Sequence, residues 1–596
     1  MTGYKAPLRD MEFALYELFS ADKILAALPR FVGLERTTMD AATAEIAKFA
    51  ERELAPLNRT GDEVGCRLEE GSVTTPPGFV EAYKALVDDG WCALAADVDH
   101  GGMGLPETLR VLAMEILGSA NMSFSDYVVL GFGGYLTVRA HAAEPIRSIC
   151  LPRLASGQWA ATMCMTEPHC GTDLGLLSTR AERAGDGTYR ITGIKIFNSG
   201  GDHDLTENII HLVLARLPDA PPGPKGVSLF LVPKFQFDQE GTLGQRNTVA
   251  VRRLERKLGY RGSATCETHF EDAVGWMVGE PGAGLRALFV MVNFARLTTA
   301  QQGLAAAEPA LQKARSYAHE RLQGRALNGP RYPELPADPI VVHPDIRRML
   351  LTGRAFTEAA RALLVWAAIN IDIAREETDK SAAELADDMV QIVTPILKAG
   401  LSEMGFEATS NAMQVFGGHG YIRDTGVEQY LRDGRLSLIQ EGANGIQALD
   451  LLVRKMNTHS GRLLRNMLVH LDRECEQLAG RKSAVEFFRP FSDAITRLRR
   501  TTEIVMAAGA RNPDEYGAAG IEYVRLCMLT LMAWIWARSG ATAYEALETG
   551  LDEAIYGEKL ATARVFFSRM LPASLGLEAV LLNGARSLME PADSSI

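Results

Sequence analysis

The chain has 596 residues, of which 47% are hydrophobic and 23% are charged. At about 100–200 residues per domain, this length excludes a single small binding module and predicts several domains. The 62 Lys and Arg residues against 74 Asp and Glu residues give a formal net charge of −12. Because a negative chain is repelled by phosphate backbones and anionic lipids, neither nucleic acid nor a membrane is an expected partner.

The eight cysteines contain no CxxC pair, which is typical of reduced thiols in a cytoplasmic protein. The first residues carry charges of both signs without the apolar core of a secretory signal. The most apolar run, 526–536, is shorter than the about 20 residues that span a bilayer. We therefore expect a cytoplasmic location.

Up to residue 159 the sequence predicts helices, because apolar residues recur every three or four positions in 11–19, 39–57 and 76–91. From residue 160 the sequence pattern changes to short β-rich runs separated by clusters of turn-forming residues, which is typical of an antiparallel sheet or barrel. These runs are YRITGIKIF at 189–197, IIHLVLARL at 209–217, GVSLFLVPKF at 226–235 and ATCETHF at 264–270.

Helical periodicity returns from residue 286 and continues to the end of the chain. Prolines at every third position, from Pro330 to Pro339, favour an extended loop between two of these helices. We predict a mainly α protein with a central antiparallel β-barrel module and an extra C-terminal helical domain. The predicted domains are an N-terminal helical domain (1–159), the β-barrel (160–285), a helical bundle with the catalytic base (286–455) and an additional helical domain (456–596).

The glycine cluster VFGGHGY at 415–421 could be mistaken for a dinucleotide fingerprint, but that motif must follow a strand and open a helix. Here it follows a predicted helix, and strands do not alternate with helices anywhere in the chain. We therefore interpret it as a helix C-terminus stopped by Gly417 and Gly418.

Several segments in this order resemble the acyl-CoA dehydrogenase family. They are MCMTEPHCGTD (163–173), GDGTYRITGIKIFNSG (185–200), ARLTTAQQGLA (295–305), YAHERLQG (317–324), AMQVFGGHGYIRD (412–424) and LIQEGANGIQALD (438–450). The resemblance covers about residues 1–455. The opening residues and the C-terminal extension are further similar to the large subgroup that includes 3-methylmercaptopropionyl-CoA dehydrogenases and some bacterial long-chain enzymes.

The resemblance implies α,β-dehydrogenation of an acyl-CoA thioester to a trans-2-enoyl-CoA, as in β-oxidation of fatty acids. Glu441, in the segment QEGANG, matches the family's base, which takes the α-proton, and the flavin N5 takes the hydride. Such a base needs a dry pocket and hydrogen-bond donors for the enolate oxygen. Some relatives place their base just before Arg296, but Ala295 cannot move a proton. Arg296 matches the arginine that helps arrange base and substrate.

The resemblance also implies FAD as the cofactor and a homodimer that completes its site. Phe197 matches the aromatic residue covering the flavin ring, Ser199 the hydroxyl reaching N5, and Arg321 with Gln323 the pair at the pyrophosphate. Gln414, Gly417 and Gly418 match the neighbouring subunit's contribution. The remaining candidate cofactor residues are Met163, Met165, Thr166, Gly171, Thr172, Asn198, Ala443 and Gly445, and the candidate substrate residues are Thr172, Asn293, Arg296 and Gly442.

Some positions depart from the family pattern. Gln440 and Ala443 stand where Tyr and Thr are usual, Asn198 replaces an apolar residue, and His169, Cys170 and Asn293 are also atypical. These departures indicate an altered substrate or weakened turnover. Cys170 is expected to be a small packing residue rather than a redox centre. The glycines of SFSDYVVLGFGGY (123–135) either enlarge the acyl cavity or are turn residues.

Three functions follow from these observations. The leading one is an acyl-CoA dehydrogenase that passes electrons to an electron-transferring flavoprotein. The second keeps the fold but is a flavin oxidase, or a dehydrogenase of an unusual or carrier-bound acyl group. The third is a non-catalytic flavoprotein of the DNA-associated kind. The net negative charge of the chain opposes this function, and the C-terminal extension (456–596) is not basic.

Overall fold

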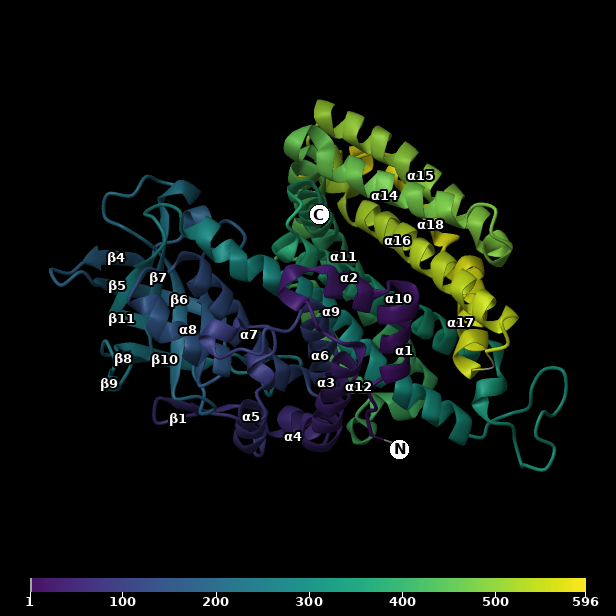
Figure 1. The fold of residues 1–596 in the computed structure, drawn as a ribbon, viewed down its shortest axis with the longest axis horizontal. Coiled ribbons are helices and arrows are strands. Elements are labelled where there is room, and N and C mark those ends of the chain that lie inside the picture. Colours follow the sequence, from purple (N-terminus) through teal and green to yellow (C-terminus); the bar gives the residue numbers. More distant parts are fainter. Residues whose placement is uncertain (1–2, 552, 596) are drawn as a thin grey trace. The chain divides into compact units, whose positions relative to one another are not determined.

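The computed structural model describes residues 3–551 and 553–595, and the chain forms two compact units (Figure 1). Unit 1 contains Met1–Ala44 and Thr299–Ile596, and unit 2 contains Glu45–Thr298. Two helices, α3 (Arg36–Phe49) and α9 (Gly284–Glu320), carry the chain from one unit to the other. The predicted boundaries of the four domains remain predictions.

Among the residues that the structure describes, unit 2 contains five further α-helices and the eleven strands. Its helices are α4 (Leu57–Val64), α5 (Phe79–Asp88), α6 (Glu107–Ala120), α7 (Met122–His141) and α8 (Ile146–Ser156). Its strands are β1 (Arg67–Glu69), β2 (Ser72–Thr74), β3 (Trp159–Cys164), β4 (Arg180–Arg183), β5 (Tyr189–Ser199), β6 (Asn208–Arg216), β7 (Val227–Pro233), β8 (Phe235–Phe237), β9 (Leu243–Arg246), β10 (Val249–Leu254) and β11 (Thr265–Val278). The four β-rich runs of the sequence correspond to β5, β6, β7 and β11.

The central sheet is mixed, so the predicted antiparallel barrel is wrong. Seven strands form it in the order β10-β11-β5-β4-β6-β3, with β7 paired to both β11 and β6. The strand β3 runs parallel to β6, whereas β5, β7, β10 and β11 pair antiparallel. Strand periodicity reports which face a side chain occupies but not the direction of the neighbouring strand, and this is why the sequence did not reveal the parallel pair.

The glycines of segment 123–135 lie inside α7, so their interpretation as turn residues is wrong. A Cβ added at Gly134 would lie 2.1 Å from the Cβ of Ala161 on β3, and one at Gly133 would lie 2.9 Å from Met291. The missing side chains therefore let α7 pack closely on β3 and α9 within this unit.

Unit 1 is helical. Its helices are α1 (Leu8–Glu12), α2 (Ala21–Ala27), α10 (Pro344–Glu376), α11 (Lys380–Val415), α12 (Glu428–Gly434), α13 (Asn444–Leu449), α14 (Arg462–Leu478), α15 (Val485–Arg511), α16 (Asp514–Glu548), α17 (Ala554–Val565), α18 (Ala573–Leu581) and α19 (Arg586–Met589). The prolines from 330 to 339 lie in a loop of turns rather than in one extended run, because Asp338 accepts hydrogen bonds from the amides of Ala326, Arg331 and Tyr332.

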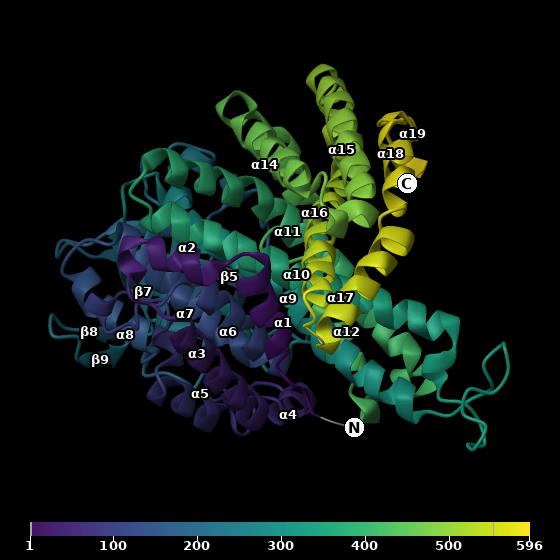
Figure 2. The ribbon, with the colours of Figure 1, turned by 45° about the vertical axis from the view of Figure 1, so that its right-hand side comes forward.

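The long helix α16 forms the centre of the C-terminal helices, where it packs on α15, α17 and α18 (Figure 2). By length and composition α16 could cross a membrane, but 78% of its most apolar window is buried in the structure. Such burial is typical of a core helix. The eight cysteines are free thiols, as expected.

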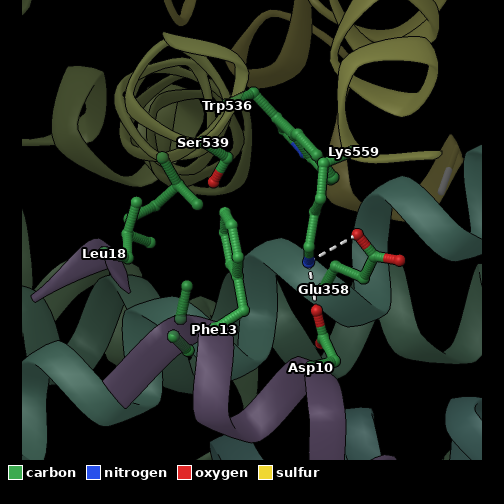
Figure 3. A pocket seen from close by; sticks show the side chains of 10 residues that line it. Asp10, Phe13, Leu18, Glu358, Trp536, Ser539 and Lys559 are labelled. Atoms are coloured by element: carbon green, nitrogen blue, oxygen red, sulfur yellow. Dashed lines mark hydrogen bonds and ion pairs between the residues drawn. The ribbon is translucent and has the colours of Figure 1, made fainter. Parts of the chain in front are cut away.

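A buried ion-pair cluster joins the first residues of the chain to α10, α17 and the unit-1 half of α9. Figure 3 shows its Asp10, Lys559 and Glu358 members. Asp10 accepts hydrogen bonds from Lys559 and Arg361. Lys559 also donates to Glu358 at 2.8 Å, and Arg361 donates to Glu308 at 2.9 Å. We call these five residues the N-terminal lock. Since Lys559 is 3% exposed and Arg361 1%, both cations depend on the carboxylates around them.

Candidate active site

The candidate base lies on a short loop of unit 1, between residues 435–438, which form a 3-10 turn, and α13. Glu441 has a φ of +55° and is followed by Gly442 with a φ of +85°. A left-handed backbone costs a residue with a side chain on the order of 1–3 kcal/mol and persists only where the surroundings impose it. Glu441 is half-buried, and its Oε2 atom is buried.

Three side-chain hydrogen bonds impose this conformation. Gln447 Nε2 donates to the carbonyl oxygen of Glu441 at 2.9 Å. Lys398 Nζ donates to the carbonyl oxygen of Gly442 at 2.8 Å and to Asn444 Oδ1 at 2.9 Å. A Cβ at position 442 would lie 2.8 Å from Gln447 Nε2, so glycine is required there. We call residues 440–445 the base loop.

The residue before the base forms a polar pair within unit 1. Gln440 Nε2 donates to Gln302 Oε1 on α9 at 2.5 Å. Ala443 and Gly445, which follow the base in the sequence, are exposed. The atypical Gln440 is thus held by a hydrogen bond, which orients its side chain.

The remaining candidate acid–base and substrate residues lie on the unit-2 half of α9. Arg296 is buried, and its guanidinium carbon lies 5.6 Å from the centre of the Phe289 ring. Asn293 is exposed, and Ala295 is buried. Asn293 and Arg296 are three positions apart, so they lie on the same turn of the helix.

The candidate flavin residues of unit 2 lie on β3, on the loop that follows it and on β5. Met163 belongs to β3, and Thr166 accepts a hydrogen bond from the amide of Ile196 through its carbonyl oxygen at 2.9 Å. Phe197 has a φ of +56° and is 61% exposed, which is unusual for a large aromatic side chain on a strand. Met163, Met165, Thr166 and Ser199 are partly buried, and Gly171 and Thr172 are exposed.

Asn198 lies differently from its two neighbours. Its side chain is buried and donates to Thr268 Oγ1 at 3.1 Å. The register between β5 and β11 shifts at this point and Phe197 has a left-handed φ, so the regular alternation of strand faces is interrupted here. The side chain of Asn198 is thus held inside the protein, whereas that of Phe197 is exposed.

A buried ion pair ties the loop after β3 to β5. Lys195 Nζ donates to Glu167 Oε1 at 2.9 Å and to the carbonyl oxygen of Met165 at 3.1 Å. Burial by itself would raise the pKa of Glu167, but the Lys195 charge and the Thr179 hydroxyl outweigh it and lower that pKa to about 2. Both residues lie inside the motif segments, yet sequence reasoning assigned them no role.

His169 and Cys170 accompany Glu167 in a group whose potential metal-ligand atoms lie within 4.8 Å of one another. His169 Nε2 already contacts the carbonyl oxygen of Leu176 at 3.0 Å, and Glu167 Oε2 accepts from Ser178. Burial raises the pKa of the Cys170 thiol, so the reactive thiolate is disfavoured. These contacts favour a packing role for Cys170.

The candidate pyrophosphate and partner-subunit residues lie in unit 1. Arg321 and Gln323, which follow α9, are exposed. The helix α11 ends at Val415 and Gly417 has a φ of +57°, which confirms the predicted helix C-terminus. A Cβ at Gly418 would meet nothing within 4 Å, and the φ of Gly418 does not require glycine either. The packing of this chain therefore does not explain Gly418.

Each unit carries residues whose chemistry suits a part of FAD. In unit 2 the exposed Phe197 ring offers a platform for an isoalloxazine. In unit 1 the exposed Arg321 guanidinium suits phosphate oxygens, and the surface at Gly418 is open. An exposed aromatic ring on strained backbone is the observation that packing alone does not account for.

Comparisons with known proteins agree with this interpretation. Four family descriptions match consecutive segments: "Acyl-CoA dehydrogenase, N-terminal domain" at 38–158, "Acyl-CoA dehydrogenase, middle domain" at 162–273, "Acyl-CoA dehydrogenase, C-terminal domain" at 282–456 and "Acetyl-CoA dehydrogenase C-terminal like" at 470–591. The chain is 38% identical to 3-methylmercaptopropionyl-CoA dehydrogenase of Ruegeria pomeroyi, over 95% of this chain and 96% of that protein. It is 32% identical to the broad-specificity linear acyl-CoA dehydrogenase FadE5 of Mycobacterium tuberculosis, over 100% of this chain and 99% of that protein.

Solved structures share the fold at lower identity. Caenorhabditis elegans ACDH-11 in complex with C11-CoA has a TM-score of 0.75 at 19% identity and covers 96% of this chain and 92% of its own. An acyl-CoA dehydrogenase of Bacillus anthracis complexed with FAD has a TM-score of 0.74 at 19% identity and covers 94% and 90%. The predicted family, enzyme class and FAD cofactor are confirmed, and the chain belongs to the acyl-CoA dehydrogenase family.

Proposed function

We propose that Glu441 removes the α-proton of an acyl-CoA thioester during its oxidation to a trans-2-enoyl-CoA. The observation that carries this assignment is the left-handed backbone of Glu441, held by hydrogen bonds to the carbonyl oxygens of residues 441 and 442. Strain that the surroundings enforce is typical of functional side chains. A carboxylate so fixed is a suitable general base, since proton transfer depends on a defined approach.

FAD, when bound, would supply the hydride acceptor for the β-carbon. Within this proposal Phe197 would pack on the flavin ring, Ser199 and Thr166 would offer hydrogen bonds to it, and Arg321 with Gln323 would hold the pyrophosphate. Arg296 arranges the base and the substrate, while Asn293, Thr172 and Gly442 contact the thioester or the pantetheine arm. The resemblance of the motif segments supports these roles.

The experiment that tests the base is anaerobic bleaching of the flavin on addition of acyl-CoA. We expect Glu441→Gln to retain FAD and to bleach about 10²–10⁴-fold more slowly, because a positioned general base contributes this much. Glu486→Gln is the matched control, since this carboxylate lies on α15 and pairs with Arg564. Wild-type bleaching in Glu441→Gln would refute the assignment.

The acyl group is proposed from the relatives and from Gln440. The named relatives act on 3-methylmercaptopropionyl-CoA and on linear acyl-CoA. A polar Gln440–Gln302 pair beside the base favours an acyl group that is short or carries a heteroatom, because a long alkyl chain gains nothing from a polar wall. Bleaching rates across 3-methylmercaptopropionyl-, butyryl-, octanoyl- and palmitoyl-CoA test this preference, and fastest reduction by palmitoyl-CoA would contradict it.

We further propose an electron-transferring flavoprotein as the electron acceptor, a cytoplasmic homodimer as the working form, and β-oxidation as the setting. A solved structure titled as an electron-transferring flavoprotein of Acidaminococcus fermentans shares the fold with a TM-score of 0.57. The exposed glycines 417 and 418 support the dimer, because nothing in this chain fills the space around Gly418. Peroxide release in air without added acceptor would instead indicate the oxidase alternative.

A further inference from the structure

We propose that Lys398 is a positioning residue for the base Glu441, acting through the carbonyl oxygen of Gly442. This inference rests on the proposed function, since it presumes that Glu441 is the base. Lys398 lies on α11, 43 positions before Glu441 in the sequence. Lys398 lies outside the segment 438–450 that contains the base.

Lys398 is a buried cation that contacts the base loop directly. Its side chain is 0% exposed, and its ammonium donates to the Gly442 carbonyl and Asn444 Oδ1. Its charge also acts on the Glu403 carboxylate, which accepts a hydrogen bond from Asn444 Nδ2 at 3.3 Å. The buried ammonium therefore supplies a strong, directed donor to the loop.

Lys398 holds the base loop at two points. Besides the Gly442 carbonyl it holds Asn444, whose side chain is also bonded to Ser402 on α11 at 3.0 Å. Gln447 holds the carbonyl oxygen of Glu441 from the other side. These contacts fix the peptide planes on either side of Gly442, and hence the direction in which the Glu441 side chain leaves the backbone.

Loss of the lysine would free the Gly442 carbonyl and let the left-handed backbone of Glu441 relax. A misplacement of about 1 Å at a catalytic group can cost about 10²-fold in rate. The effect should appear in the proton-transfer step, because Lys398 touches the loop that carries the base. Binding of CoA thioesters and of FAD should change little.

The test compares Lys398→Met with Lys559→Met in the full-length flavoprotein. Lys559 is a buried lysine of the same unit that belongs to the N-terminal lock, where it donates to Asp10 and Glu358. We expect Lys398→Met to keep its FAD and to lower kcat by about 10–10²-fold with little change in KM. The isotope effect from α-deuterated acyl-CoA should grow in Lys398→Met, because proton removal becomes slower, and stay at its wild-type value in Lys559→Met.

Other outcomes separate this inference from the proposed function. A folded Lys398→Met with wild-type kcat and isotope effect, beside an inactive Glu441→Gln, overturns the inference and leaves the base in place. An active Glu441→Gln overturns the proposed function. If Lys398→Met does not fold, Lys398→Gln, which keeps one amide donor, is judged by the same criteria. Failure of both variants to fold would assign Lys398 to folding and overturn the inference.

Discussion

Two regions of unit 1 bury a lysine in different ways. In the N-terminal lock, Lys559 donates to the carboxylates of Asp10 and Glu358, so the charge is neutralised where it lies (Figure 3). In the base loop, Lys398 donates to a backbone carbonyl and an amide oxygen. The first arrangement joins segments 549 positions apart. The second holds a single loop in a strained conformation.

The comparison shows that the partner, and not burial alone, decides what a buried cation does. Removing one member of a carboxylate pair leaves a buried opposite charge without compensation, and the whole fold becomes less stable. Removing Lys398 also takes its charge away from Glu403, but the atoms that accept its hydrogen bonds are neutral, so the larger effect is expected on the geometry of the loop.

The largest effect on stability is expected for Asp10→Ala. This change removes one carboxylate from both Lys559 and Arg361, which keep Glu358 and Glu308 as partners, and breaking a buried pair costs up to about 3–5 kcal/mol. Urea denaturation followed by circular dichroism should show an earlier transition than in wild type, while kcat of the folded enzyme stays unchanged. Equal stability of Asp10→Ala and wild type would show that the lock does not stabilise the fold.

The same pair predicts how stability depends on pH. Burial would raise the pKa of Asp10, but Lys559 and Arg361 outweigh it and hold that pKa below its ordinary value. A lowered folded-state pKa means that the stabilisation is complete above about pH 4, the ordinary range of Asp, and is lost as the pH falls further. The melting temperature should therefore drop below this pH in wild type. Asp10→Asn should show a smaller drop, and a drop of equal size would contradict the assignment.

A smaller effect is expected from Gln447→Leu on α13, next to the base loop. It removes the hydrogen bond to the Glu441 carbonyl, a contact of about 1 kcal/mol that corresponds to a loss of about fivefold in kcat. Lys398→Met, which frees two contacts, should lower kcat more. The reverse order, measured by steady-state turnover, would place the main support of the loop on the Gln447 side.

The smallest effect is expected from Phe197→Ala, a change at an exposed side chain of unit 2. Loss of stacking should weaken FAD binding by about 0.5–1.5 kcal/mol. The melting temperature of the FAD-free protein should stay unchanged, because the ring is already exposed. Equilibrium dialysis of FAD measures the first quantity, and an unchanged affinity would remove Phe197 from the proposed flavin site.

The sequence predicted the parts of the fold that depend on local pattern. The β-rich runs became β5, β6, β7 and β11, and the helical periodicity predicted from residue 286 onward corresponds to α9 and the helices that follow it. It did not predict the parallel β3–β6 pair or the packing role of Gly134, because both depend on residues distant in the chain. The N-terminal lock was missed for the same reason.

The candidate site likewise contains residues that could be predicted from the sequence and residues that could not. Glu441 and Phe197 were found because the short segments around them resemble motifs of a known family. Lys398 and Gln447 were missed, since a lysine within an amphipathic helix and a glutamine after a glycine turn carry no pattern of their own. Only the structure shows that both donate to the loop around Glu441.

The most direct test of the central claim is exchange of the α-hydrogens of acyl-CoA with deuterated water, followed by mass spectrometry under anaerobic conditions. Exchange reports proton removal without relying on the colour of the flavin. We predict deuterium incorporation by the wild-type enzyme and almost none by Glu441→Gln with FAD bound. Undiminished incorporation by that variant would show that another group removes the proton.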